Sequence, residues 1–257
     1  MRASRRTFLT LASGALAATL GGRASAIRRR RPKLPKAILF DAFPIFDPRP
    51  VFARVTTAIP DKGAQLAALW RTRQFEYCWL RAAGARYEDF WKVTEDALVA
   101  AARELKIDLS PDDRAHLMQP YLELAAYPDV SATLRALRGV GVRLALLSNL
   151  TPRMLHGLIE HAGLGGLFEH AVSTDQVRTY KPDPRAYQLG IDILQLRRED
   201  VLFAAFAGWD VAGAKWFGLE TFWVNRSAQP IEELGAAPDA VGSTLADLAG
   251  YLKVGDG

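Results

Sequence analysis

The chain has 257 residues, of which 49% are hydrophobic and 24% charged, and it contains 20 Gly and 14 Pro. This composition excludes a disordered or collagen-like chain and provides enough apolar side chains for a sizeable core. The single cysteine, Cys78, excludes an intramolecular disulfide and cannot by itself furnish a cysteine-rich metal site.

The formal charge of +5 is concentrated at the N-terminus. Ten of the 33 Lys and Arg residues fall within residues 1–36, which contain no acidic residue. Residues 37–257 therefore carry 23 basic and 28 acidic residues, a net charge of −5. The folded part of the chain lacks the basic excess typical of nucleic-acid binding, and we expect no nucleic-acid partner.

The N-terminal segment has the pattern of a bacterial export signal. Arg5 and Arg6 form a twin-arginine pair, the apolar stretch 8–22 follows, and residues 24–26 read Ala-Ser-Ala, which fits a cleavage site. The apolar stretch falls short of the roughly 20 residues that a spanning helix needs. We predict a signal peptide over 1–26, a basic linker over 27–36, the twin-arginine export machinery as partner, and a periplasmic or extracellular location.

Short apolar runs then alternate with longer amphipathic segments. The runs expected to form buried parallel strands are 37–40, 142–147, 171–173, 201–205 and 221–224. The segments of helical length between the later runs lie near 151–162, 184–195 and 210–218. This alternation predicts an α/β fold with a doubly wound parallel sheet.

About a hundred residues without a strand-like run separate the first predicted strand from the second. Hydrophobic residues recur there at helical spacing, first from Leu66 to Leu80 and again from Phe90 to Leu105. We predict an inserted helical cap subdomain over 58–127, and a core domain made of 37–57 and 128–257. The stretch after Gly235 is interpreted as a last helix and a frayed end.

Polar residues follow several of the predicted strands, where ligands bind in open α/β sheets. They are Asp41, Ser148, Asn149, Lys181 and Asp210. Each alone is also typical of a turn or a helix cap. Together they favour a catalytic site, because a carboxylate beside an ammonium group stays ionised and oriented as a nucleophile requires. A second carboxylate, Asp210, could polarise a water.

This order of residues resembles the haloacid dehalogenase superfamily over most of 37–225, and especially its type II, L-2-haloacid dehalogenases. The resemblance rests on Phe40-Asp41-Ala42-Phe43, Trp70-Arg71, residues 74–81, Tyr87 with residues 89–91, residues 147–149, residues 180–184 with Tyr187, and residues 208–210 with residues 213–215. It implies the Rossmann-like core of that superfamily, hydrolysis of short (S)-2-haloacids to (R)-2-hydroxyacids through an Asp41 ester, no metal and no cofactor. It also suggests a homodimer.

The resemblance implies a role for each matching residue. Asp41 would attack C2 of the acid and Lys181 would pair with Asp41. Arg71 and Asn149 would meet the departing halide, and Ser148 would bind the substrate carboxylate. Tyr187 would support the Lys181 side, and Asp210 would direct the hydrolytic water. An apolar wall that excludes water would be formed by Phe43, Phe75, Phe90 and Trp209.

The chain departs from the family pattern at three positions. Ile45 stands where the family has Thr, and Ala205 and Ala207 stand where it has Ser and Asn. The resemblance implies that the missing Thr hydroxyl would hydrogen-bond near the nucleophile and that the missing Ser and Asn would position the hydrolytic water. Losing one water-orienting donor typically costs about a hundredfold in rate. We therefore expect alkylation of Asp41 to be possible and hydrolysis of the ester to be slow or differently arranged.

Two other functions stay open at this point. An exported binding protein that lost turnover on the same fold would explain the three departures. A magnesium-dependent phosphatase of the wider superfamily would need a second Asp two residues after the nucleophile, where Phe43 stands, and further acids beside Asp210. Chelator sensitivity and phosphate release would identify the phosphatase.

Overall fold

The computed structural model describes residues 33–255. The predicted signal peptide, its twin-arginine pair and residues 27–32 of the predicted linker lie outside the described residues. Within the described range, none of the helices combines the length and the apolar character needed to span a bilayer.

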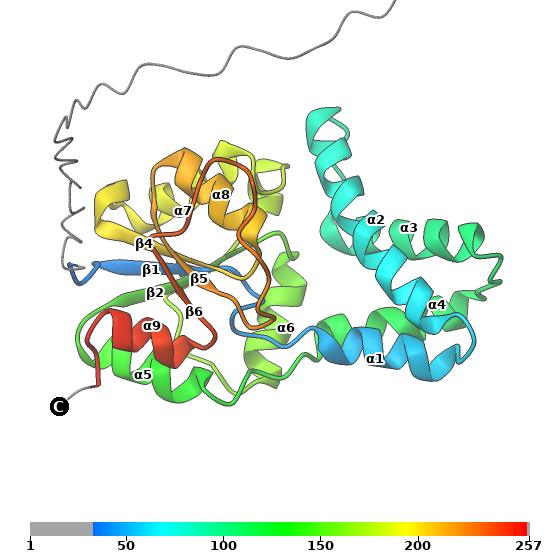
Figure 1. Ribbon diagram of the computed structural model, residues 1–257, viewed down its shortest axis with the longest axis horizontal. Helices are drawn as coiled ribbons and strands as arrows, with labels where there is room; N and C mark the ends of the chain where they lie inside the picture. The colour runs from blue at the N-terminus through cyan, green and yellow to red at the C-terminus, as the bar shows by residue number, and fades with distance from the viewer. Residues whose placement is uncertain (1–32, 256–257) are drawn as a thin grey trace, which may run out of the picture. The chain divides into compact units, whose positions relative to one another are not determined.

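A six-stranded parallel sheet forms the centre of the described chain (Figure 1). Its strand order is β3-β2-β1-β4-β5-β6. The strands are β1 (Ala37–Phe40), β2 (Arg143–Ser148), β3 (His170–Ser173), β4 (Val201–Ala205), β5 (Glu220–Val224) and β6 (Ala240–Gly242). The expected α/β class with a parallel sheet is confirmed. β6 lies in the stretch where only a helix and a frayed end are expected, and that expectation is wrong.

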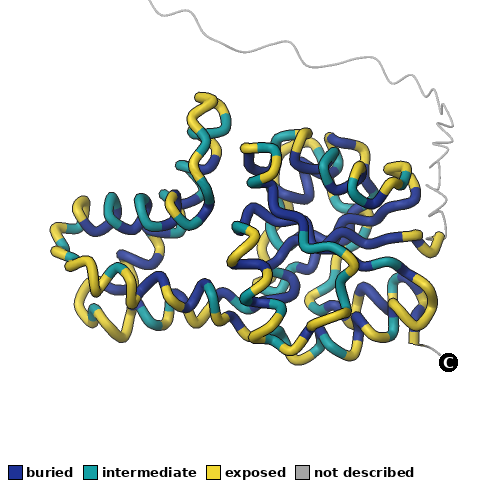
Figure 2. Tube along the Cα trace, turned by 180° about the vertical axis from the view of Figure 1, so that it is seen from behind, coloured by how far each residue is buried: buried dark blue, intermediate teal, exposed yellow. Residues whose placement is uncertain are grey.

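Helices cover both faces of the sheet because each strand buries alternate side chains on opposite faces. In β1, Ile38 and Phe40 join the core under three helices, and Ala37 and Leu39 join the core under two others. The first group is α5 (Val130–Gly139), α6 (Pro152–His161) and α9 (Leu245–Tyr251), and the second is α7 (Pro184–Leu194) and α8 (Gly208–Phe217). Figure 2 shows that the strands between these layers are buried.

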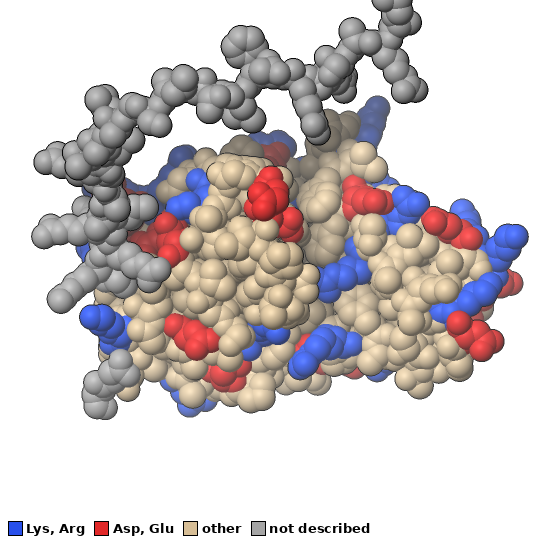
Figure 3. All heavy atoms as spheres, viewed as in Figure 1, with Lys and Arg blue, Asp and Glu red and all other residues tan. Residues whose placement is uncertain are grey.

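A helical region is inserted between β1 and α5. It contains α1 (Arg49–Ala58), α2 (Gly63–Ala83), α3 (Phe90–Glu104), α4 (Pro111–Met118) and the 3-10 turn η1 (Gln119–Leu122). The first helix of the insertion thus begins nine residues before the predicted cap boundary at 58. On the face shown in Figure 3, basic and acidic side chains are interspersed over this region.

The buried side chains of the insertion belong to the same hydrophobic cluster as those on one face of the sheet, and they include a few satisfied polar groups. The Trp70 indole donates to the Thr94 carbonyl at 2.7 Å, and the Gln74 amide donates to the Thr94 hydroxyl at 2.7 Å and to the Tyr121 hydroxyl at 3.1 Å. Cys78 of α2 is fully buried, and this burial raises the pKa of its thiol. The division of the chain into core and cap domains remains a prediction.

Candidate active site

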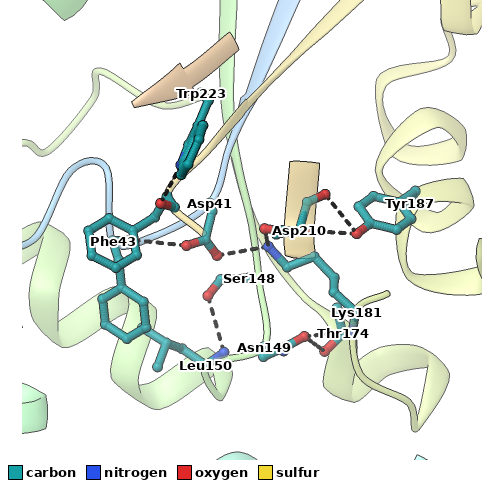
Figure 4. Close-up of polar contacts among 11 residues, drawn as sticks. Asp41, Phe43, Ser148, Asn149, Leu150, Thr174, Lys181, Tyr187, Asp210 and Trp223 are labelled. Carbon is teal, nitrogen blue, oxygen red and sulfur yellow. Dashed lines mark hydrogen bonds and ion pairs between the residues drawn. The ribbon is translucent and has the colours of Figure 1, made fainter. Parts of the chain in front are cut away.

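Polar side chains from separate segments meet at the carboxyl edge of the sheet (Figure 4). Asp41 directly follows β1, Asn149 follows β2, and Asp210 lies in the first turn of α8 after β4. Since β1 pairs in parallel with both β2 and β4, these strand ends lie side by side. Lys181 comes from the loop between α7 and the 3-10 turn η2 (Thr174–Val177), and another 3-10 turn, η3 (Arg198–Asp200), leads into β4.

Lys181 lies between two carboxylates. Its Nζ is 2.8 Å from Asp41 Oδ1 and 2.6 Å from Asp210 Oδ2, and its side chain is fully buried. Burial alone would lower the pKa of Lys181, but the negative charges of Asp210 and Asp41 outweigh it and the pKa is raised. The ammonium group therefore stays charged and holds one oxygen of each carboxylate.

Asp41 lines the cavity with a carboxylate that Lys181 contacts through only one oxygen. Its Oδ2 accepts a hydrogen bond from the Phe43 backbone N–H at 3.2 Å, while Oδ1 contacts Lys181. The residue is 8% exposed, and it lines the cavity described below. One carboxylate thus has a fixed orientation and partial access from a largely apolar space, which is the arrangement a nucleophile needs.

Asp210 is held by a tyrosine as well as by Lys181. The Tyr187 hydroxyl donates to Asp210 Oδ1 at 2.7 Å. Burial raises the pKa of Asp210 to about 6, with Lys181 acting against this rise and the charge of Asp41 adding to it. At neutral pH Asp210 is mostly ionised, and it can accept a proton more readily than an ordinary Asp.

Gly213 allows this close packing. A Cβ at that position would lie 2.4 Å from the Tyr187 hydroxyl and 2.5 Å from the Pro182 Cβ. No real Cβ approaches other atoms so closely, so a side chain here would push α8 away from the Lys181 loop. The absence of a side chain at 213 is what brings Asp210 within reach of Lys181 and Tyr187.

Ser148 and Asn149 end the neighbouring strand. Ser148 Oγ accepts from the Leu150 backbone N–H at 3.2 Å. Asn149 Oδ1 accepts from the Lys181 backbone N–H at 3.0 Å and from the Thr174 hydroxyl at 3.2 Å. These two donors fix the orientation of the amide, so the Asn149 amide nitrogen, which has no hydrogen-bond partner in residues 33–255, remains as a donor for a ligand.

A small inner cavity of about 20 Å³ adjoins these groups. Eleven residues line it: Asp41, Phe43, Phe75, Phe90, Ser148, Asn149, Leu150, Phe206, Ala207, Trp209 and Asp210. Eight of the eleven predicted site residues are among them. Lys181 and Tyr187 do not line the cavity but hold its carboxylates from behind, and Ile45 and Ala205 are fully buried.

Arg71 lies outside the inner cavity. Its guanidinium is 5.5 Å from the centre of the Phe52 ring and 5.9 Å from the centre of the Phe206 ring. It lines two further cavities, of about 260 and 600 Å³. The part of the chain that the structure describes provides no ion-pair partner for this arginine, so its charge is available to an anion.

Three residues of this region have roles that were not predicted. Thr174 orients Asn149, Gly213 admits Tyr187, and Phe206 lines the inner cavity. Thr174 directly follows β3, so the rule used for the other strand ends would have found it. Among residues 33–255, no group of three or more His, Cys, Asp or Glu side chains is arranged to hold a metal ion.

Comparisons with known proteins identify the family of this chain. The family described as haloacid dehalogenase-like hydrolase matches residues 30–218. An (S)-2-haloacid dehalogenase of Pseudomonas sp. (strain YL) is 42% identical over 205 residues, which are 79% of this chain and 88% of that protein. Haloacetate dehalogenase H-2 of Moraxella sp. (strain B) is 39% identical over 79% of this chain and 92% of its own.

Solved structures extend the likeness to the fold. The crystal structure of one L-2-haloacid dehalogenase is 40% identical with a TM-score of 0.83, covering 86% of this chain and 99% of its own. The L-2-haloacid dehalogenase of Xanthobacter autotrophicus with chloropropionic acid covalently bound is 33% identical with a TM-score of 0.79, covering 87% of this chain and all of its own, 100%. The chain therefore belongs to the haloacid dehalogenase-like hydrolases, among the L-2-haloacid dehalogenases.

Proposed function

We propose that the protein converts short (S)-2-haloacids to (R)-2-hydroxyacids through an ester on Asp41. The observation that carries the proposal is the buried Lys181 ammonium, 2.8 Å from an Asp41 carboxylate that faces a largely apolar cavity. The relatives named as (S)-2-haloacid dehalogenases, and the relative with chloropropionic acid covalently bound, support the same chemistry.

The first step is substitution at carbon. An Asp41 oxygen attacks C2 from the side opposite the halogen, the new C–O bond forms as the carbon–halogen bond breaks, and the halide leaves with the bonding electrons. The configuration at C2 is inverted. The side chains of Phe43, Phe75 and Trp209 exclude water from the nucleophile. A carboxylate in bulk solvent would first have to lose its hydration water before it could attack.

Hydrogen-bond donors complete this step. The free amide nitrogen of Asn149 meets the departing halide, whose negative charge grows in the transition state. Arg71 adds a positive charge from the adjoining cavities, which attracts the halide. Ser148 binds the carboxylate of the acid, which fixes C2 in front of the nucleophile.

The second step is hydrolysis of the ester. Water attacks the carbonyl carbon of Asp41 and Asp210 accepts its proton. When the acyl C–O bond breaks, this proton passes to the leaving alkoxide oxygen, so the product is the hydroxyacid, its hydroxyl oxygen comes from Asp41, and both carboxylates are regenerated. Ala205 and Ala207 offer no side-chain donor to this water, and Ile45 offers none beside the nucleophile. We therefore expect the second step to be slower than the first and the ester to accumulate.

The test combines halide release with intact-protein mass spectrometry after mixing with (S)-2-chloropropionate. The expected result is released chloride together with an added mass that the Asp41→Asn variant does not show. In a single turnover in ¹⁸O-labelled water, the first label should enter Asp41 and not the product. Absence of both chloride and added mass would refute the proposal.

An arrested second step would leave the protein trapped as its Asp41 ester, and the apolar residues at 45, 205 and 207 favour this outcome. Chloride released once per protein molecule, with a persistent adduct, would identify it. Chloride released over many turnovers would remove it.

We also propose that the twin-arginine segment directs export and that the protein acts as a homodimer. Export rests on the sequence pattern of residues 1–26, and the homodimer rests on the resemblance to the L-2-haloacid dehalogenases. Fractionation of cells that make the full chain, compared with a chain in which Arg5 and Arg6 are both changed to Lys, tests export. Light scattering on the purified protein tests the dimer, and a monomer mass would refute it.

A further inference from the structure

Phe206 stands where three cavities meet. It lines the inner cavity of about 20 Å³ beside Asp41, and it also lines both outer cavities that contain Arg71. The larger of these, which we call the aromatic cleft, has a volume of about 600 Å³ and includes Trp79 and Trp223. One half-buried side chain is therefore part of the wall of all three spaces.

Several contacts hold the Phe206 ring in this position. Its backbone carbonyl accepts from the Trp223 indole N–H at 2.9 Å. Its ring meets the Phe43 ring edge-to-face, with centroids 5.9 Å apart, and the Arg71 guanidinium is 5.9 Å from its centre. Because the Phe43 N–H in turn donates to Asp41, the ring is fixed relative to the nucleophile.

The cavity sizes give this position a consequence for the substrate. The inner cavity is near the 10–15 Å³ that one water requires, whereas the aromatic cleft lies in the range of 300–1,000 Å³ found for ligand sites. The lining side chains thus nearly fill the inner cavity, and the chain of an acid with C2 at Asp41 needs space outside it. The aromatic cleft, on the other side of Phe206, offers a large space with an aromatic lining for such a chain.

We propose that Phe206 is a specificity-determining residue that limits the length of the 2-haloacid by closing the inner cavity against the aromatic cleft. This inference rests on the proposed function, since it names the acids which that site accepts. Shortening the side chain joins the two spaces, and the apolar chain of a longer acid then contacts Phe75 and Trp209, which line both.

The experiment compares wild type, Phe206→Leu and Phe206→Ala with (S)-2-chloropropionate and (S)-2-chlorohexanoate, using chloride release. The ratio of kcat/KM for the longer acid to that for the shorter one should rise at least about tenfold in Phe206→Ala, since even one methylene group fitted or rejected changes specificity by that factor. Phe206→Leu should lie between, and it guards against poor folding of the alanine variant.

Phe52→Leu is the matched control. Phe52 also contacts the Arg71 guanidinium, but it lines only the smaller outer cavity and not the inner one. In Phe52→Leu the ratio of kcat/KM for the longer acid to that for the shorter one should stay within twofold of the wild-type ratio. An equal change for both acids in the Phe206 variants, a similar ratio change in Phe52→Leu, or a wild type that already uses both acids equally well would overturn the proposal.

Failure of the proposed function gives a different result. If wild type releases no chloride from the shorter acid, the affinities for propionate and hexanoate, followed by tryptophan fluorescence, decide the inference. Trp79, Trp209 and Trp223 line the aromatic cleft and report on its occupancy. Phe206→Ala should then gain affinity for hexanoate over propionate by at least about tenfold, and an unchanged ratio would refute the limit on length.

Discussion

Replacing Tyr187 by Phe should change the pH at which the ester on Asp41 is hydrolysed. The Tyr187 hydroxyl donates to Asp210 at 2.7 Å, and this hydrogen bond lowers the pKa of Asp210, which is about 6 in the intact site. Because the bond stabilises the charged carboxylate, its loss raises the pKa. A hydrogen bond to a charged group contributes about 1.5–3 kcal/mol, and about 1.4 kcal/mol corresponds to one pKa unit, so its loss should raise the pKa of Asp210 by about 1–2 units.

The assay isolates the second chemical step. Protein is mixed with (S)-2-chloropropionate, and the decay of the adduct is followed by quenched mass spectrometry across a pH series. In Tyr187→Phe the acidic limb of the decay rate should move upward by about 1–2 pH units, with little change on the alkaline plateau. Halide release, which does not need Asp210 as a base, should be affected less.

Tyr180→Phe is the control, since the Tyr180 hydroxyl donates to the Glu88 carbonyl and not to Asp210. Its acidic limb should coincide with that of wild type. If the acidic limb of the adduct-decay profile stays at the same pH or moves to lower pH in Tyr187→Phe, the assignment of Asp210 as the base is refuted. An equal loss at every pH would show that Tyr187 positions Asp210 without tuning its pKa.

Three further predictions follow from the packing and charges of the site. Gly213→Ala places a Cβ 2.4 Å from the Tyr187 hydroxyl and should lower the free energy of unfolding by about 1–3 kcal/mol in urea titrations, whereas Gly250→Ala, with open space around it, should not. Lys181→Met leaves two carboxylates without their cation, and it should abolish halide release and lower the free energy of unfolding by about 3–5 kcal/mol. Halide release by this variant at the wild-type rate would contradict the prediction. A divalent-metal chelator should leave halide release unchanged, and a loss restored by Mg²⁺ would contradict the proposed mechanism.

Much of the sheet could be predicted because its strands are buried on both faces. Buried parallel strands read as continuous apolar runs, and 37–40 and 201–205 coincide with β1 and β4. β6 was missed because it has three residues, 240–242, lies at the sheet edge and is only partly buried. The start of the helical insertion could not be predicted from the sequence either, because α1 begins at Arg49, between two prolines.

The site was predictable where its chemistry follows the strand ends. Asp41, Asn149 and Asp210 lie together because parallel strands bring their carboxyl ends to one edge. The position of Arg71 could not be read in this way, because the orientation of a helix in the insertion depends on packing between segments distant in the sequence. Phe206 was missed because an aromatic residue after a strand is typical of ordinary core.

The burial of Cys78 protects the protein from alkylation by its own substrates. Haloacids alkylate thiols, and they do so through the thiolate. The only cysteine of the chain is enclosed in the helical insertion, where burial keeps its thiol protonated. An enzyme that meets these electrophiles at every turnover thus offers them one carboxylate at the place where attack is useful, and no reactive sulfur where attack would inactivate it.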